Sequence, residues 1–396
     1  MIMKNLKGIF GEAINDNLAK QLALSEDDIT QESSSFGCPC KRKRKNKCCG
    51  KRKRRKCNAC CKRGRKIIYY TQAVADLGTY FVRRRKRGVT LFVVGQIQIT
   101  NGSDPKYADG LIVANFSDFI MKFTGLGIDG DNGMELGIVL GNKDIADRTC
   151  NYTVDGTFKD INGVKQNASV TNLTKATTIQ ASNIENFTIT GIVFDGTTRI
   201  LGDPTTAPVI AANIVNCTYT LKDVTILNTT SAVVATPKID CTGLALINSF
   251  GTLDGVTVGV VTTANAAAVG IKSTELDPSS TTAETLVRWK NQKVQGVIGE
   301  SAIGVMLEAV PGTTIAATFG SQTINTVAAT AVDQPAVGFF CSGVDQPRYN
   351  ATTVVISVTN SFTQGRKNPT LATGFVNENA SGMPLVMLVG VVATPV

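Results

Sequence analysis

The sequence predicts a mostly β protein with a solenoid-like middle, and three observations support this fold class. Thr, Val, Ala, Asn and Gly dominate the 396-residue chain after residue 90, a composition that favours short strands and turns. Segments of the central region repeat at intervals of 30 to 32 residues. Residues 90–100 (TLFVVGQIQIT) end in the alternation of apolar and polar side chains that is typical of a half-buried strand.

The internal repeat is the main evidence for a solenoid. Residues 181–190 (ASNIENFTIT) match residues 211–220 (AANIVNCTYT) at six of ten positions, at a spacing of 30. A second pattern, an apolar residue followed by a small or acidic turn and another apolar residue, begins at Ile189, Leu221 and Leu253 with a spacing of 32. Repeats of this length that consist of short strands stack as the coils of a β-solenoid.

Stacked coils place equivalent side chains next to one another. The alignment makes Asn186, Asn216 and Asn248 equivalent, so we expect their amides to form a ladder of hydrogen bonds. The segments FTITGIVFDG and YTLKDVTILN resemble coils of right-handed parallel β-helix proteins, and the resemblance implies that fold for the middle of the chain. The alternative for the same Val- and Thr-rich strands is a β-sandwich.

Changes in composition divide the chain into four predicted regions. The first contains an amphipathic helix, in which Leu6, Phe10, Ile14, Leu18 and Leu22 recur every four residues, followed by a polar linker. The last is expected to be a separate β-sandwich-like domain, with one short helix at 282–292 that carries the only tryptophan, Trp289. The predicted regions are 1–36 (helix and linker), 37–89 (an irregular basic, cysteine-rich segment), 90–265 (a β domain with repeats of about 30 residues) and 266–396 (a C-terminal β domain).

The charge is distributed unevenly between the two ends of the chain. Residues 1–90 contain 24 Lys/Arg and 7 Asp/Glu, a net charge of +17, whereas residues 91–396 contain 17 Lys/Arg and 24 Asp/Glu, a net charge of −7. A polycationic front and a mildly acidic body can attract one another between subunits, and the front can also bind a polyanion. Homo-oligomers and nucleic acid are therefore the expected partners.

The basic segment has the residues with the most distinctive chemistry. Neighbouring Lys and Arg stabilise thiolates, so its cysteines are expected to be reactive and to form cross-links between chains. Cys57 and Cys60 have the spacing of half a zinc site, so a structural zinc ion is the alternative and the only cofactor considered. The candidate residues for cross-linking or metal binding are Cys38, Cys40, Cys48, Cys49, Cys57, Cys60 and Cys61.

Polyanion binding is compatible with either use of the cysteines. Residues 38–66 contain sixteen Lys/Arg and no aromatic residue, so contacts would be made with phosphates and would not include base stacking. The candidate anion-binding residues are Lys41, Arg42, Lys43, Arg44, Lys51, Arg52, Lys53, Arg54 and Arg55, together with Arg83, Arg84 and Arg85 in a second basic cluster.

Two family resemblances give the segment a context. Cysteine doublets among Lys and Arg, in a β-rich chain without histidine, resemble the cross-linked structural proteins of bacterial spore coats and exosporia, which implies an insoluble outer layer or appendage. A basic arm before a β body is also similar to the coat proteins of some viruses, in which the arm contacts the packaged genome. The arm of this chain differs from that pattern, because it follows 37 ordinary residues and is rich in cysteine.

Catalysis is not expected. The chain has no histidine, which excludes Ser–His and Cys–His nucleophile pairs within it. Parallel β-helices also occur in polysaccharide-cleaving enzymes, and Asp195, Asp223 and Asp254 lie near equivalent turns, so a polysaccharide-binding or polysaccharide-cleaving protein is a second alternative. No secretory signal and no apolar run long enough to span a membrane are visible.

The sequence therefore predicts a non-catalytic, self-assembling structural protein of a coat, surface layer or appendage. The basic cysteine-rich segment would cross-link or anchor it, since so charged a segment cannot form a core of its own. The alternative is a capsid or nucleocapsid protein whose basic arm binds nucleic acid. Either function implies a location in an outer structure, a spore coat, an exosporium or a virion.

Overall fold

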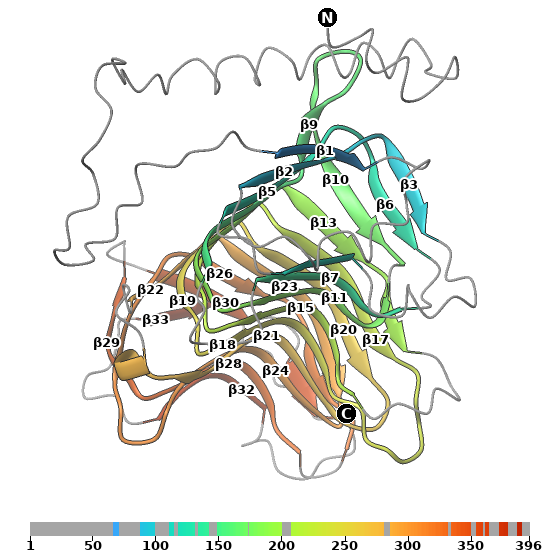
Figure 1. Ribbon diagram of the computed structural model, residues 1–396. Helices are drawn as coiled ribbons and strands as arrows, with labels where there is room; N and C mark the ends of the chain where they lie inside the picture. Colours follow the sequence, from blue (N-terminus) through green and yellow to red (C-terminus); the bar gives the residue numbers. More distant parts are fainter. Residues whose placement is uncertain are drawn as a thin grey trace, which may run out of the picture.

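The computed structural model shows a parallel β-solenoid in which three sheets run along the stack of coils (Figure 1). Among the described residues, the only helical element is a single 3-10 turn at Pro278–Ser280. The structure describes residues 66–70, 88–99, 111–114, 118–130, 134–141, 149–172, 174–199, 207–280, 286–331, 334–349, 354–358, 361–363, 372–378 and 386–389.

Sheet A has 10 described strands. In spatial order they are β1 (Lys66–Tyr70), β2 (Val89–Val93), β5 (Asp118–Phe123), β8 (Thr149–Asp155), β12 (Ile184–Thr190), β16 (Thr218–Lys222), β19 (Phe250–Asp254), β22 (Leu286–Lys290), β25 (Ile315–Phe319) and β29 (Val344–Tyr349).

Sheet B has 14 described strands, four of which are short additions beside the main path. The main path is β3 (Gln96–Ile99), β6 (Gly127–Gly130), β10 (Lys165–Thr171), β13 (Ile192–Asp195), β17 (Thr225–Ser231), β20 (Thr257–Thr263), β23 (Gln292–Gly299), β26 (Gln322–Ile324), β30 (Val354–Val358) and β33 (Val386–Val389). The additions are β9 (Thr157–Lys159), β14 (Thr197–Arg199), β27 (Val327–Ala329) and β31 (Ser361–Thr363).

Sheet C has 9 described strands and completes the coils. They are β4 (Leu111–Ala114), β7 (Met134–Gly141), β11 (Thr174–Ser182), β15 (Val209–Val215), β18 (Cys241–Ile247), β21 (Ala267–Leu276), β24 (Ser301–Ala309), β28 (Ala336–Ser342) and β32 (Ala372–Glu378). Each central coil passes from sheet C to sheet A to sheet B, as β15, β16 and β17 do. Neighbouring coils pair in parallel, and the solenoid predicted for the middle of the chain is confirmed.

The corner from sheet C to sheet A begins with an asparagine in three successive coils. Asn183, Asn216 and Asn248 have φ angles of 57°, 53° and 44°, a left-handed conformation that asparagine tolerates better than most residues. The Asn216 amide donates to Asn183 Oδ1 at 3.2 Å, and the Asn248 amide donates to Asn216 Oδ1 at 2.9 Å. The backbone N–H of Asp277 then donates to Asn248 Oδ1 at 3.2 Å. These side chains form an asparagine ladder that crosses three coils.

The ladder differs from the prediction in one member. The parallel register pairs Ser182 with Val215, which places Asn183 beside Asn216 at a spacing of 33 residues. The spacing of 30 that made Asn186 equivalent to Asn216 is therefore wrong. Asn186 lies within β12, where its amide donates to Asn151 Oδ1 at 3.1 Å. The alignment at a spacing of 30 matches the Ala-x-Asn-Ile string that begins at residues 181 and 211. The true register is set by the left-handed residue at the corner, which identity of residues does not reveal.

The spacing of 32 residues gives the correct register inside sheet A. Ile189 pairs with Leu221, and Leu221 pairs with Leu253, all with side chains buried in the core. The same column continues from Leu253 to Trp289. Trp289 therefore lies in strand β22, and the helix expected at 282–292 is wrong for the part of it that the structure describes.

Trp289 also connects coils that are not neighbours. Its indole N–H donates to the hydroxyl of Tyr219 at 2.9 Å, although the strand β19 lies between their two strands. The residue of β19 that pairs with Tyr219 is Gly251, where an added Cβ would lie 1.9 Å from the Tyr219 carbonyl oxygen. A glycine at this position lets the backbone of β19 approach that of β16 closely, beneath the bond between the indole and the hydroxyl.

The strands after residue 286 add further coils to the same solenoid. β24, β28 and β32 extend sheet C, and their pairing with one another is parallel. The buried core also continues without interruption, from Tyr70 at one end to Val344 at the other. The sandwich-like unit expected after residue 266 is therefore not what these strands form, because the sequence shows short apolar strands but not the sheets that they join.

Substitution of Asn216 tests the asparagine ladder. Asn216→Gly keeps the left-handed backbone and removes both amide hydrogen bonds, so we expect a loss of about 1–3 kcal/mol of unfolding free energy. Asn216→Ala adds the strain of a Cβ in that conformation and should lose roughly 1–2 kcal/mol more. Urea denaturation of the purified variants measures both values.

Asn186→Ala is the matched control. It removes an exposed amide pair from an ordinary strand position, and we expect a change within about 0.5 kcal/mol. A larger loss from Asn186→Ala than from Asn216→Ala would contradict the register described above.

Candidate functional site

The predicted cross-linking and anion-binding residues lie outside the described residues. This applies to the seven cysteines from Cys38 to Cys61, to the basic residues among them and to Arg83, Arg84 and Arg85. The candidate zinc pair, Cys57 and Cys60, lies there too. These assignments stay predictions, and the structure bears on function through the body alone. The amphipathic helix expected within 1–36 also lies outside the described residues.

The three aspartates of the polysaccharide alternative do not occupy equivalent positions. Asp195 ends β13 in sheet B, where its carboxylate accepts a hydrogen bond from the Asn228 amide at 2.6 Å. Asp223 is the corner residue between sheets A and B, with a φ angle of 51°. Asp254 is the last residue of β19 in sheet A. The expectation of equivalent turns is wrong for Asp195, because only Asp223 and Asp254 come from the same corner.

Asp254 is held as a charged group by its neighbours. Lys290 Nζ lies 2.9 Å from its Oδ2, and the Asn291 amide donates to its Oδ1 at 3.2 Å. Burial opposes ionisation of this carboxyl, but the hydrogen bonds from Lys290 and Asn291 outweigh it and hold the pKa of Asp254 below its ordinary value. The ion pair is largely exposed, so its contribution to stability is small.

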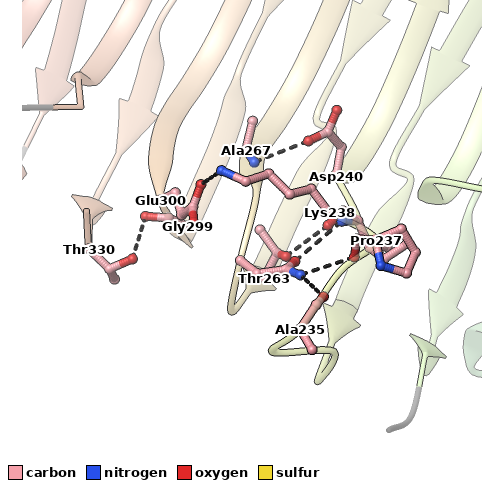
Figure 2. A network of polar contacts seen from close by, with 11 residues as sticks. Ala235, Pro237, Lys238, Asp240, Thr263, Ala267, Gly299, Glu300 and Thr330 are labelled. Carbon is pink, nitrogen blue, oxygen red and sulfur yellow. Dashed lines mark hydrogen bonds and ion pairs between the residues drawn. The ribbon is translucent and has the colours of Figure 1, made fainter. Parts of the chain in front are cut away.

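A second polar cluster fixes the corner between sheets B and C (Figure 2). The Asn265 amide donates to the carbonyl oxygens of Ala235 and Pro237 at 2.6 and 3.1 Å, and Asn265 Oδ1 accepts from the Ile239 N–H at 3.2 Å. Lys238 pairs with Glu300 two corners further along the stack, past the corner that contains Asn265. Each of these groups bonds to loop backbone or to another coil, so the cluster stabilises the loop 232–240.

The outer face of sheet A is polar, whereas that of sheet B is mixed, with threonine columns beside two exposed apolar side chains, Leu227 and Val260. Sheet A has a column of threonines, Thr153, Thr188, Thr220 and Thr252, that continues with Arg288 and Thr318. Beside it runs a charged column that includes Lys222, Asp254 and Lys290. Sheet B repeats the pattern with Thr198, Thr230 and Thr262, and the Thr230 hydroxyl donates to Thr198 Oγ1 at 3.1 Å.

The outer face of sheet C is different, because much of it is apolar. Half-buried aliphatic and aromatic side chains alternate there with fully buried ones that point into the core. Parallel sheets are normally covered on both faces, and contiguous apolar patches at a surface mark places where something else binds. The residues of this apolar face are Val139, Ile210, Val215, Ile247, Ile303, Met306 and Phe340.

Sequence reasoning missed the apolar face, although a signal for it exists. Strand β18 (CTGLALI) is apolar at nearly every position, and six of its seven residues are buried. A continuous apolar run indicates a strand that is covered on both sides, whereas alternation indicates one wet face. The most regular repeats in the sequence are the alternating Thr-rich segments of sheet A, and their pattern indicates one face exposed to solvent.

Three cysteines of the body are buried and form no disulfide. Cys217, Cys241 and Cys341 each lie in the core. Burial raises the pKa of the Cys241 thiol to about 12, and the nearby negative charge of Asp240 adds to this shift. Burial alone raises the pKa of Cys341. Neutral, inaccessible thiols of this kind are inert.

Other features of the described residues can be stated briefly. Among them, no three or more Asp, Glu or Cys side chains converge in a cluster that could hold a metal ion. No described helix is both long enough and apolar enough to cross a membrane. Comparison of the chain with protein-family models, with curated proteins and with solved structures finds no match.

Thiol alkylation tests the difference between the two groups of cysteines. In the native protein at pH 8 we expect Cys241 and Cys341 to remain unmodified, because a thiol with so high a pKa is almost fully protonated at that pH. The cysteines between residues 38 and 61 should react first. Peptide mass spectrometry after iodoacetamide treatment measures the modification at each position.

The same treatment in 6 M guanidinium, the control, should modify every cysteine. Native modification of Cys341 at the rate of the N-terminal cysteines would contradict its buried position.

Proposed function

We propose that this protein is a self-assembling structural protein, a component of a coat, surface layer or appendage. Its solenoid body forms contacts between copies through the apolar outer face of sheet C. Its basic cysteine-rich segment then cross-links or anchors the assembled copies. The observation that supports this proposal is the group of apolar side chains on the outer face of sheet C, which recur in successive coils.

The chemistry of the faces favours a protein surface as the partner of sheet C. The Ile, Val, Met and Phe side chains of this face gain free energy only when water is removed from them, at about 25 cal/mol for each Å2 of apolar surface buried. The column that contains Met306 also contains polar side chains, Gln180, Asn213 and Lys272, which would need polar partners at the contact. Adjacent coils align these side chains in columns, as the pairing of Ile303 with Val269 and Val337 shows. A regular apolar face of this kind suits a regular partner, and another copy of the chain is the simplest one.

The N-terminal segment fits the role of a covalent or ionic tie. Its seven cysteines among sixteen Lys/Arg would have activated thiols, in contrast to the inert thiols of the body. The compositional resemblance to spore-coat and exosporium proteins supports the same role. An odd number of cysteines also leaves at least one for a bond between chains.

Nucleic-acid binding is the second candidate function, and one observation favours it. The sixteen positive charges within residues 38–66 would release many counterions from a nucleic acid, so binding would weaken steeply with salt. A gel-shift titration of reduced protein with a random-sequence duplex, at 50 and 300 mM salt, tests this function directly. Nuclease treatment that dissolves the assemblies would favour the capsid alternative over cross-linking.

A matched pair of lysine substitutions tests assembly through sheet C. Ile210→Lys places a charge on the apolar face, whereas Thr220→Lys places the same charge on the polar face of sheet A in the same coil. We expect Ile210→Lys to weaken self-association at least tenfold, equivalent to about 1.4 kcal/mol, and Thr220→Lys to leave it unchanged. Sedimentation velocity of reduced protein over a range of concentrations measures association.

Circular dichroism checks that both variants keep the β fold. A monomeric unsubstituted protein at all concentrations, or equal association of the two variants, would overturn assembly through this face. A separate comparison of gels with and without reductant tests the covalent part of the proposal.

A further inference from the structure

A projecting hairpin is the one described element that interrupts the regular coils. It is formed by β9 and β10 within residues 157–167 (Figure 1). These two strands pair antiparallel, whereas the other described strand pairs are parallel. In the figure the hairpin extends past β1, beyond the end of the stack at which the described chain begins. It is inserted between β8 of sheet A and the part of β10 that pairs within sheet B.

The tip of the hairpin is apolar and exposed. Ile161 and Val164 are 66% and 53% exposed, among the most exposed large apolar side chains of the described residues. Side chains of this type gain nothing by pointing into water at the end of an arm. Their position suits contact with a partner.

The turn that presents these two side chains is well ordered. Asp160 Oδ1 accepts hydrogen bonds from the backbone N–H groups of Asn162 and Val164, both at 2.9 Å, and Asp160 Oδ2 accepts one from the Gln166 amide at 3.2 Å. The bond from Val164 is the main reason why the pKa of Asp160 lies below its ordinary value. A fixed turn loses little conformational entropy when its tip binds.

The base of the tip is positively charged. Lys159 and Lys165 are directly opposite one another across the hairpin, and both are exposed. Like charges at such a pair destabilise the hairpin slightly in isolation, and an acidic partner would reverse that effect.

A hollow of matching character lies at the corner between sheets C and A. It has a volume of about 450 Å3, and its apolar lining comes from Met306, Ala309, Val310 and Pro311. Met306 belongs to the apolar face of sheet C, so the hollow is continuous with that face. Glu275 and Glu308 line it as well and outnumber its one cation, Lys272.

We infer that the tip of the β9–β10 hairpin of one copy docks into this corner hollow of a second copy. Ile161 and Val164 contact the apolar lining, while Lys159 and Lys165 approach Glu275 and Glu308. The inference rests on the proposed self-assembly and names the contact that joins two copies first, without which their sheet C faces stay apart. Because the two surfaces differ, the contact is heterologous, and its repetition produces a closed ring or an open fibre.

A mixing experiment tests the contact with reduced, full-length protein. Variant one carries Ile161→Asp and Val164→Asp and lacks a functional tip. Variant two carries Glu275→Arg and Glu308→Arg and lacks a functional hollow. By sedimentation velocity, each variant alone should fail to associate at concentrations at which the unsubstituted protein does.

Mixed one to one, the two variants should form a heterodimer and nothing larger. The intact hollow of variant one accepts the intact tip of variant two. The tip of variant one and the hollow of variant two are both damaged, so no further copy can be added. Val234→Asp is the matched control, because Val234 is equally exposed at 68% but lies away from the hairpin, and it should assemble normally. Raising the salt concentration should weaken the heterodimer, since its rim is ionic.

Two results would overturn the inference while the proposed function stands: assembly of variant one at the unsubstituted level, or no heterodimer in the mixture. A monomeric unsubstituted protein would instead refute the proposed self-assembly. Circular dichroism confirms that the variants retain their fold, so a loss of association reports on the contact.

Discussion

The body depends on one constraint, the residue-by-residue parallel pairing of each coil with the next. This pairing satisfies the backbone N–H and C=O groups between neighbouring coils and fixes which side chains form each column. Because successive residues of a strand point to opposite faces, the same register that aligns Ile189, Leu221 and Leu253 inside sheet A aligns Thr188, Thr220 and Thr252 outside it. The core and the outer surfaces are therefore set together.

Corners are the positions at which this constraint is most demanding on sequence. The tight corner between sheets C and A has a left-handed residue, and asparagine adopts this conformation while its amide bonds to the equivalent asparagine one coil away. The asparagine ladder therefore contributes both to the direction of the chain and to the stacking. An insertion into a coil is tolerated at a corner, as the β9–β10 hairpin between sheets A and B shows.

The sequence predicted the solenoid because the apolar column at a spacing of 32 is long and regular. It did not predict the ladder correctly, since Asn183 and Asn186 are both compatible with a repeat and only backbone conformation distinguishes them. Trp289 was assigned to a helix because its flanking residues are polar and its column partners are distant in sequence. The apolar face of sheet C could not be predicted without knowing which strands align with one another. The match between the hairpin and the hollow could not be predicted without knowing their shapes.

The bond from Trp289 to Tyr219 has a consequence for how this chain can change in length. Solenoids commonly grow and shrink by gain or loss of whole repeats. Here the repeat that contains Gly251 is clamped between two others, and deleting it or duplicating it would change the separation of the indole and the phenol. Natural variants should therefore gain or lose repeats elsewhere in the stack, and a repeat module for engineering is better taken from outside this interval.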